Sequence, residues 1–365
     1  MNSEVFGKQP QDPALGNCLK CYVGHSNDEE VRFSSSSGGI VTELLAFALE
    51  NGLIDGALVT RMKKDCPLET EPIIATTREE IVSASKSKYC PAAPSQALGR
   101  ALKANARLAF VGLPCHIHGV RKAEANIKAL KEKIVLHVGI MCSHTVSFRG
   151  TEFLLEKLGV SPEQVEEIAY RGQGWPGSLL LKLKSRSNLA VPYVGDWNAY
   201  EPVFSCFFFT PWRCLACYDE SNELADISLG DAWLPVLKKE RKGKSIIVVR
   251  TRKGEEILNR ALSAGAIHLE PVRSEKVKCS QAEPLKFKKT DISVRLAMIQ
   301  FFGRKTPNFT TKHSFGHSPF SWIRNLYALS NVKFSDNHSL RKLLIHVPFP
   351  IIRLYYGVYK LLCDI

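Results

Sequence analysis

The sequence predicts an α/β fold, in which a mixed, largely parallel sheet with flanking helices is followed by a basic helical C-terminal extension. Helix-like and strand-like segments alternate from about residue 35 to 160, which is typical of strand–helix–strand units. The 365 residues are 45% hydrophobic, enough to bury a sizeable core. The segment 284–365 carries 13 Lys and Arg against three acids, so +10 of the net charge of +13 falls there.

Three regions are expected along the chain. Residues 1–30 look irregular, residues 31–283 carry the α/β pattern, and residues 284–365 form the basic extension. The end of the extension, LRKLLIHVPFPIIRLYYGVYKLL, mixes aliphatic, aromatic and basic residues. Such a segment suits a membrane interface, and it equally suits docking on the protein's own core or on a partner.

The first core helix is expected over residues 38–52, because Ile40, Leu44 and Ala48 recur at helical spacing. An apolar strand follows. The elements expected after this helix are the strand 54–62, helices 77–84 and 95–106, a strand–turn–helix unit 107–120, a strand 133–144, a helix 150–160, and strands within 164–195, 226–233 and 244–251.

The sequence shows no targeting signal and no simple membrane span. It has no uninterrupted run of about 18 apolar residues, and its polar N-terminus lacks the apolar core of a secretion signal. We therefore expect a cytoplasmic protein, with membrane association through the extension as an open alternative. Hydrolase chemistry has little support, because no Ser/His/Asp arrangement or His-Glu-x-x-His motif occurs.

Eleven cysteines are many for a cytoplasmic chain and indicate metal or redox chemistry rather than disulfides. Cys115 and Cys142 each follow an apolar strand, and Cys214 and Cys217 form a C-x-x-C pair in an aromatic turn. Ligands collect at the carboxyl ends of strands in such sheets. Four thiolates suit a 4Fe-4S cluster or a tetrahedral zinc ion, and the residues alone leave open whether the four meet.

Three further segments suit an anionic ligand. The turn Ser36–Gly39 begins a helix with several hydroxyl and N–H groups, which suits a phosphate, although serine also caps helices routinely. Lys88 and Tyr89 offer a cation and a ring for a pyrophosphate and an aromatic group, and a solvated basic loop explains them equally well. Gly112 and Pro114 set a tight turn just before the first of the four cysteines.

Polar residues beside the cysteines have two interpretations each. His116, His118 and His144 are placed to relay protons, or they pack as ordinary polar side chains. Asp226 and Asp231 support a cluster, or they end a strand in solvent.

Six short segments occur in a specific order within about residues 18–270. They are SSSGGIVTELLAFALENGLIDGALV, SKY, FVGLPCHIHGVRKA, GIMCSH, WRCLACYDE and ADISLGDAWLP. In this order they resemble the coenzyme F420 hydrogenase/dehydrogenase beta-subunit family, which includes the related 7-hydroxymethyl chlorophyll a reductase. The resemblance implies a flavin- and iron–sulfur-dependent oxidoreductase, with FAD in a non-Rossmann α/β pocket and a 4Fe-4S cluster near it.

The resemblance also implies which residues hold these cofactors and what they do. It places the cluster on Cys115, Cys142, Cys214 and Cys217. It places the flavin beside Ser36, Ser37, Gly38, Gly39, Lys88, Tyr89, Gly112 and Pro114. Hydride transfer at FAD would be coupled to one-electron transfer through the cluster, with reduction or oxidation of coenzyme F420 as a candidate reaction. It identifies no catalytic residue.

The implied partners are an electron carrier, such as ferredoxin or coenzyme F420, and a partner subunit; no nucleic acid is expected. Many members of the family carry a ferredoxin module with repeated C-x-x-C runs, whereas this chain has only Cys18 and Cys21. Whether these two, with or without Cys90, join a second cluster stays open. Two other interpretations remain: a zinc-stapled binding or scaffold protein, and a non-catalytic electron-transfer subunit of a larger complex.

Overall fold

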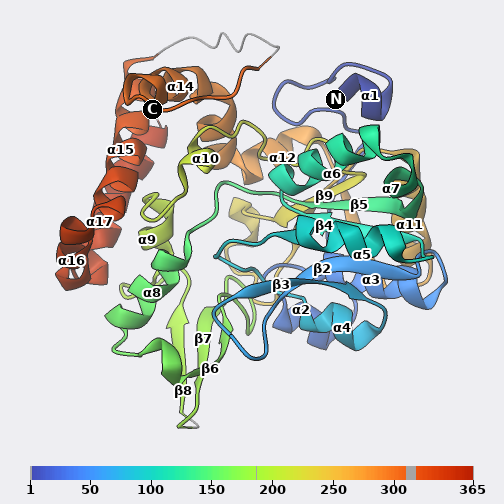
Figure 1. Cartoon of the computed structure of the whole chain (residues 1–365), viewed down its shortest axis with the longest axis horizontal. Helices are drawn as coiled ribbons and strands as arrows, with labels where there is room; N and C mark the ends of the chain where they lie inside the picture. The colour runs from blue at the N-terminus through green and yellow to red at the C-terminus, as the bar shows by residue number, and fades with distance from the viewer. Residues whose placement is uncertain (1, 186, 310–317, 365) are drawn as a thin grey trace.

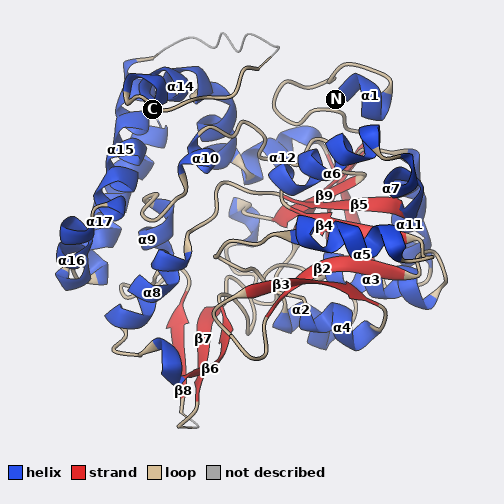
Figure 2. Cartoon of the chain, viewed as in Figure 1, coloured by secondary structure: helices blue, strands red, loops and turns tan. Residues whose placement is uncertain are grey.

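A mixed eight-stranded sheet forms the centre of the larger part of the protein (Figures 1 and 2). The computed structural model describes residues 2–185, 187–309 and 318–364. The strand order across the sheet is β11-β1-β10-β9-β5-β4-β2-β3. The strands are β1 (Lys20–Ser26), β2 (Gly56–Met62), β3 (Thr70–Ala75), β4 (Leu108–Gly112), β5 (Ile134–Ile140), β9 (Ile227–Asp231), β10 (Ser245–Val249) and β11 (Ile267–Val272).

The predicted mixed α/β sheet is confirmed, and its parallel pairings lie together. β2, β4, β5 and β9 run parallel to one another in the middle of the sheet. β3 at one edge, and β10, β1 and β11 toward the other edge, pair in antiparallel fashion. The carboxyl ends of the four parallel strands therefore lie side by side. Ligands usually bind beside these strand ends in such sheets.

Helices cover both faces of this sheet. They are α1 (Asn2–Phe6), α2 (Glu29–Ser34), α3 (Ile40–Glu50), α4 (Arg78–Ser83), α5 (Leu98–Lys103), α6 (Pro114–Asn126), α7 (Lys128–Lys133), α11 (Arg252–Ser263) and α12 (Ser274–Ser280), with a short 3-10 turn (Pro94–Ala97) before α5. Ala57 and Val59 of β2 pack in one apolar cluster with α3 and α11, whereas Leu58 between them packs with α5 and α6 on the other face. This alternation produces a three-layer core.

The N-terminal segment is not irregular, so the expectation for residues 1–30 is wrong. β1 lies inside the sheet, where Cys21 pairs with Val248 of β10 on one side and Val272 of β11 on the other. Both partner strands lie more than 200 residues further along the chain. A strand of seven residues interrupted by Gly24 and His25 has a weak local signal, and only the distant partners stabilise it.

A second, three-stranded antiparallel sheet confirms the strands expected within 164–195. It consists of β6 (Val165–Ala169), β7 (Ser178–Leu183) and β8 (Asn188–Pro192). The segments around it are α8 (Phe148–Lys157), α9 (Glu201–Ser205) and α10 (Trp212–Leu215). Their apolar residues form a core cluster separate from the three that pack against the large sheet.

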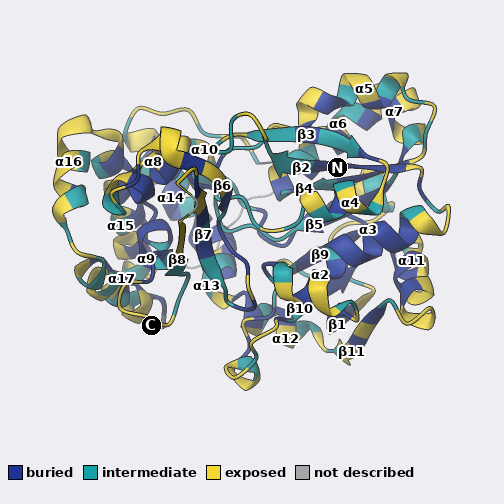
Figure 3. Ribbon diagram, turned by 90° about the horizontal axis from the view of Figure 1, so that it is seen from below, coloured by how far each residue is buried: buried dark blue, intermediate teal, exposed yellow. Residues whose placement is uncertain are grey.

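The C-terminal extension is helical, as predicted. Its segments are α13 (Ala282–Leu285), a π-helical turn (Lys286–Thr290), α14 (Ile292–Phe301), α15 (Pro319–Asp336), α16 (His338–His346) and α17 (Phe349–Asp364). α15 and α17 pack on the cluster that contains α8, α9 and the small sheet, and their outer surfaces are exposed (Figures 1 and 3). Among the described helices, none is both long and apolar enough to cross a membrane.

Candidate cofactor site

Three distant segments bring Cys115, Cys142, Cys214 and Cys217 into one region, which we call the four-cysteine site. The first of these cysteines is the second residue of α6, directly after β4, and Cys142 follows the neighbouring parallel strand β5. Cys214 lies in α10 and Cys217 in the turn after it. The two segments are joined because the Cys142 N–H donates to the Glu220 carbonyl oxygen at 2.9 Å.

Asn222 fixes the ends of both strands against the turn that carries Cys217. Its Nδ2 donates to the carbonyl oxygens of Gly112 at the end of β4, 2.8 Å away, and of Ile140 at the end of β5, 3.1 Å away. Asp219 in turn accepts the Asn222 N–H at 2.9 Å. The positions of the three cysteine-bearing segments therefore depend on one buried polar side chain.

The four thiols lie within electrostatic reach of one another. Burial raises the pKa of the Cys115 thiol, and Cys217 and Cys214 raise it further. Burial also raises the pKa of Cys142 well above its ordinary value, and the other three thiols act in the same direction. Cys115 and Cys142 thus resist ionisation beside the other thiols, so the site needs positive charge to hold four thiolates.

Two buried cations from the extension supply such charge. Lys288, only 2% exposed, lies in the π-helical turn. Burial opposes its charge, but Cys217, Cys142 and the other thiol of the C-x-x-C pair raise the Lys288 pKa above its ordinary value. Arg295, which is fully buried, donates from Nε to the Leu215 carbonyl oxygen at 2.5 Å. Its Nη2 has no hydrogen-bond partner within the described residues.

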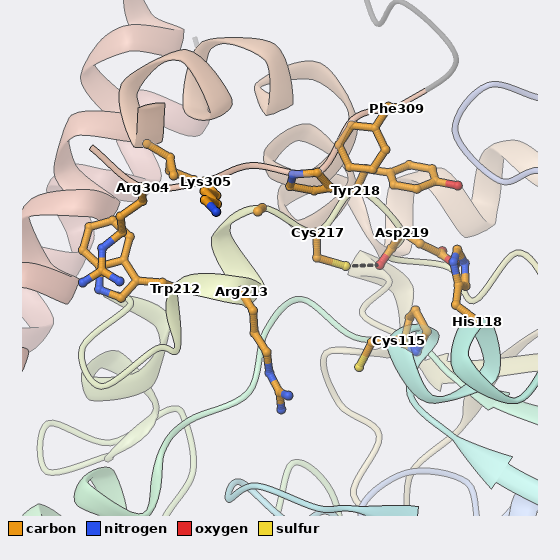
Figure 4. Close-up of a pocket in the computed structure, with 14 residues that line it drawn as sticks. Cys115, His118, Trp212, Arg213, Cys217, Tyr218, Asp219, Arg304, Lys305 and Phe309 are labelled. Atoms are coloured by element: carbon orange, nitrogen blue, oxygen red, sulfur yellow. Dashed lines mark hydrogen bonds and ion pairs between the residues drawn. The ribbon is translucent and has the colours of Figure 1, made fainter. Parts of the chain in front are cut away.

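A cavity of about 590 Å³ opens beside two of the thiols (Figure 4). The core contributes Cys115 and Cys217, and residues after α14 contribute cationic and aromatic groups, so core and extension build it together. Its lining residues are Pro114, Cys115, His118, Trp212, Arg213, Ala216, Cys217, Tyr218, Asp219, Ile299, Arg304, Lys305, Pro307 and Phe309. Basic side chains outnumber the single carboxylate in the cavity wall, so the cavity favours an anionic ligand.

The turn Ser36–Gly39 is anchored on three sides. The Ser36 hydroxyl accepts the Ser87 N–H at 2.8 Å, and the Gly38 N–H donates to the Ser245 hydroxyl of β10 at 3.1 Å. A Cβ at Gly38 would lie 2.6 Å from the Gly24 carbonyl oxygen, so glycine is required there for packing. Gly39 has a φ of 76° and begins α3.

Lys88 and Tyr89 both lie close to this turn but serve different roles. The Lys88 Nζ donates to the carbonyl oxygens of Ala84, Ser85 and Lys86 at 2.5, 2.6 and 2.9 Å, which uses its three N–H groups. Burial lowers the pKa of Lys88 to about 7. The Tyr89 ring stacks on Tyr193, with ring centres 5.8 Å apart. A ligand would gain a bond from Lys88 only by displacing a carbonyl.

Gly112 and Pro114 make the expected tight approach. A Cβ at Gly112 would lie 2.8 Å from both Phe110 and His116, so only glycine fits between β4 and α6. Pro114 is the first residue of α6 and lines the cavity.

Arg171 is the residue near the turn that the sequence did not single out. Its guanidinium donates to the Ser36 carbonyl oxygen and to the Asp231 carboxylate, each at 2.6 Å. It also lies over the Tyr193 ring, 4.7 Å from its centre. The nearby Trp175 Nε1 is buried and has no hydrogen-bond partner among the residues that the structure describes. Arg171 sits in the irregular segment YRGQGWPGS, which matches no motif, so only its contacts reveal it.

Two of the three histidines near the cysteines, His116 and His144, are packed against other groups of the protein. Burial lowers the pKa values of His116 and His144 to about 4, and the His144 Nε2 lies 3.0 Å from the Phe204 carbonyl oxygen. His118 pairs with Asp219 at 2.9 Å on the cavity wall. Asp226 instead bonds to the buried His137, so it supports the sheet.

Within the three described stretches of chain, no three cysteine, histidine or carboxylate side chains converge closely enough to hold a single metal ion.

Two family models match consecutive parts of the chain, and both describe the beta subunit of coenzyme F420 hydrogenase/dehydrogenase. Residues 21–99 match the model of its N-terminal part, and residues 105–275 match the model of its C-terminal part. The second match contains all four cysteines of the site, whereas Lys288 and Arg295 lie beyond it.

Individual proteins are similar over most of the chain. A coenzyme F420 hydrogenase subunit beta from Methanothermobacter thermautotrophicus is 29% identical over 301 residues, which cover 80% of this chain and 99% of that protein. A coenzyme F420-dependent sulfite reductase from Methanocaldococcus jannaschii is 29% identical over 69% of this chain and 38% of its own length. A chain of the F420-reducing [NiFe] hydrogenase complex from Methanosarcina barkeri superimposes with a TM-score of 0.64 at 25% identity, covering 82% of this chain and 99% of that one.

Proposed function

Because this chain belongs to the coenzyme F420 hydrogenase/dehydrogenase beta-subunit family of oxidoreductase subunits, we propose that it is a flavin- and iron–sulfur-dependent electron-transfer protein. Cys115, Cys142, Cys214 and Cys217 would hold a 4Fe-4S cluster, and the core beside the turn Ser36–Gly39 would hold FAD. When bound, FAD supplies two-electron hydride chemistry and the cluster supplies one-electron transfer.

The observation that carries this proposal is the meeting of four thiols and two buried cations. Four thiolates outweigh the positive charge of the metal core they bind, so a protein that buries them needs compensating charge. Lys288 provides an ammonium group beside Cys217, and Arg295 keeps an unused N–H for a sulfur acceptor.

The flavin assignment has its own support. Near the Ser36–Gly39 turn, the buried Trp175 Nε1 finds no acceptor in the described part of the chain. The Tyr89, Tyr193 and Trp233 rings gather around Arg171. Arg171 holds the turn in place through the Ser36 carbonyl oxygen. These groups suit an aromatic ligand that accepts hydrogen bonds, whereas Lys88 would serve the flavin mainly by shaping the 84–88 turn.

The cavity at the four-cysteine site suggests how electrons enter or leave. Arg213, Arg304 and Lys305 would attract an acidic carrier such as ferredoxin toward Cys115 and Cys217. Coenzyme F420 is the proposed hydride partner, because several similar proteins are named for it. A larger complex is also proposed, since the similar solved chain comes from a hydrogenase complex.

A direct count of cofactors tests the proposal. The chain is purified without oxygen, and iron, acid-labile sulfide, flavin and zinc are measured per chain. We expect four irons, four sulfides and one FAD, with absorbance from both cofactors. Stoichiometric zinc without iron or flavin would instead establish the zinc-stapled scaffold.

We propose in addition that the extension rests on an anionic membrane surface. The face of α15 that packs on the protein carries polar groups, since the buried Arg324 donates to Asp291 at 2.8 and 2.9 Å. Trp322 and Leu326 of the same helix are exposed. α17 carries an outward stripe of apolar residues at helical spacing. These residues are Ile351, Leu354, Val358 and Leu361, each more than half exposed. Exposed Lys342 and Lys360 add the charge that attracts anionic headgroups.

Vesicle binding tests this surface. The variant L354Q/V358Q should lose co-sedimentation with anionic vesicles, whereas V236Q, which changes an exposed valine of the core, should bind as the natural chain does. Equal binding by all three proteins would contradict the membrane contact. So would a natural chain that does not bind vesicles and instead self-associates through α17.

A further inference from the structure

Cys18 and Cys21 form a second, smaller thiol site, and Ser221 contacts the loop before it through the Leu15 carbonyl oxygen. Their sulfur atoms lie 3.2 Å apart, within contact distance. Cys18 is half-buried, whereas Cys21 is 6% exposed and packs in the apolar cluster under β1 and β10. One thiol can therefore meet a reagent from solution, and the other can meet only its neighbour.

The backbone holds the two thiols in place. Cys21 lies in β1, which is paired on both sides. The loop before it is held by the buried Arg250, whose Nη1 donates to the carbonyl oxygens of Leu15 and Asn17 at 2.5 and 2.7 Å. The Leu19 N–H donates to the Val249 carbonyl oxygen at 2.8 Å. Little conformational entropy remains to be lost when the two sulfurs join.

The electrostatic surroundings separate the two thiols. The hydrogen bond from Cys21 lowers the pKa of Cys18 to about 7, Arg250 acts in the same direction, and Asp12 opposes them. The pKa of Cys21 is raised far above its ordinary value by the same hydrogen bond and by burial, with Glu275 adding to the rise. Near neutral pH the accessible thiol is thus the nucleophile and the buried thiol stays protonated.

The pair has too few neighbours for a cluster. Among the described residues, the charged groups with the largest effects on Cys18 and Cys21 are Arg250, Asp12 and Glu275, and no further cysteine is among them. Cys90, the third cysteine considered for a second cluster, is buried in a different apolar core. Two thiols at contact distance, one accessible and one buried, have the arrangement of a dithiol that exchanges with disulfides.

We propose that Cys18 and Cys21 are a redox-active dithiol that reduces small disulfides such as oxidised glutathione. The Cys18 thiolate attacks one sulfur of the substrate and releases the first thiol, which leaves a mixed disulfide on Cys18. Cys21 then attacks the Cys18 sulfur, gives up its proton to solvent and releases the second thiol. The substrate gains two electrons and two protons, and the protein gains one intramolecular disulfide.

Peptide mapping of the full chain tests this reaction. The chain is purified without oxygen, equilibrated with reduced and oxidised glutathione at a series of ratios, alkylated and cleaved with trypsin. Cleavage after Lys20 separates Cys18 from Cys21, so the two peptides remain joined only by the new disulfide. We expect the joined peptides at ratios that leave the isolated Cys66 and Cys279 reduced.

Two single variants assign the roles. Cys21→Ser should keep glutathione on Cys18 as a stable mixed disulfide, and Cys18→Ser should take up almost none, because Cys21 is buried. The proposal would be overturned if the joined peptides were absent at every glutathione ratio. It would also be overturned if both variants took up equal amounts of glutathione. Loss of iron in either variant would make the pair a metal ligand and overturn it as well. Iron and flavin content in the natural chain report separately on the proposed function.

Discussion

The four-cysteine site and the Cys18–Cys21 pair both consist of thiols, but they differ in how far apart their cysteines lie in the sequence. The two cysteines of the pair lie within four residues of the sequence, and β1 together with the Arg250 contacts to the preceding loop positions them. The four-cysteine site draws on β4, β5 and the turn after α10, and it receives its cations from the extension. The pair therefore depends on β1, its neighbouring strands and Arg250, whereas the larger site depends on every segment that meets there.

Both sites also converge on the segment 219–223. Arg250 bonds to the Ser221 carbonyl oxygen at 2.7 Å and to the loop before Cys18, and Asn222 bonds to the ends of β4 and β5. The same turn therefore contacts the surroundings of both sites. Substitutions at either site can show whether the two sites load and react independently.

The largest effect is expected from Cys214→Ala. Removing one of four thiolates should abolish iron binding almost completely, because a cluster held by three cysteines is labile. Iron analysis and the visible spectrum measure this, with Cys66→Ala as the matched control. The Cys18–Cys21 disulfide should still form. Unchanged iron in Cys214→Ala would remove that residue from the cluster.

A smaller loss of iron is expected from Asn222→Gly. The change removes the bonds to Gly112 and Ile140 and leaves two buried carbonyls unpaired, at a cost of about 1–3 kcal/mol each. Glycine tolerates the backbone φ of 61° at this position, so the effect comes from the lost side chain. Thermal unfolding and iron occupancy should fall together, while disulfide formation by the pair continues. Full occupancy would show that the strand ends hold their positions without this residue.

Lys288→Met should shift the reduction potential of the four-cysteine site without emptying it. The loss of a buried positive charge destabilises the reduced, more negative state, so the potential should become more negative by tens of millivolts. Redox titration monitored by spectroscopy measures the shift. Lys286→Met is the control, because Lys286 lies in the same turn but donates to the Cys363 carbonyl oxygen at 2.5 Å. An equal shift in both variants would point to the turn rather than to the charge.

The smallest expected effect is a change in the pH dependence of Cys18. Asp12 raises the pKa of this thiol, so Asp12→Asn should lower it and move the alkylation rate profile, half-maximal near pH 7 in the natural chain, to lower pH. The rate rises with pH in both proteins because the thiolate is the reactive form. A profile that stays in place would indicate that solvent screens the Asp12 charge. Iron content should not change.

Local patterns identified much of the fold. The periodicity of residues 38–52 predicted α3, and the apolar runs before Cys115 and Cys142 predicted β4 and β5. The order of motifs predicted the family, which the family models confirm. β1 escaped detection because its stability comes from strands more than 200 residues away. Arg171 escaped because its contacts, and no pattern around it, define its role.

By itself, the sequence determined the hydrophobic periodicities, the C-x-x-C spacings and the basic extension, because these properties belong to neighbouring residues. Only the tertiary structure decided which thiols meet, that Asn222 joins the strand ends, and that Lys288 is buried among sulfurs rather than solvated. The physical reason is that burial and electrostatic potential depend on atoms brought together from the whole chain. The groups that surround a lysine in a basic run come from distant segments, so its burial and pKa cannot be predicted from its sequence neighbours.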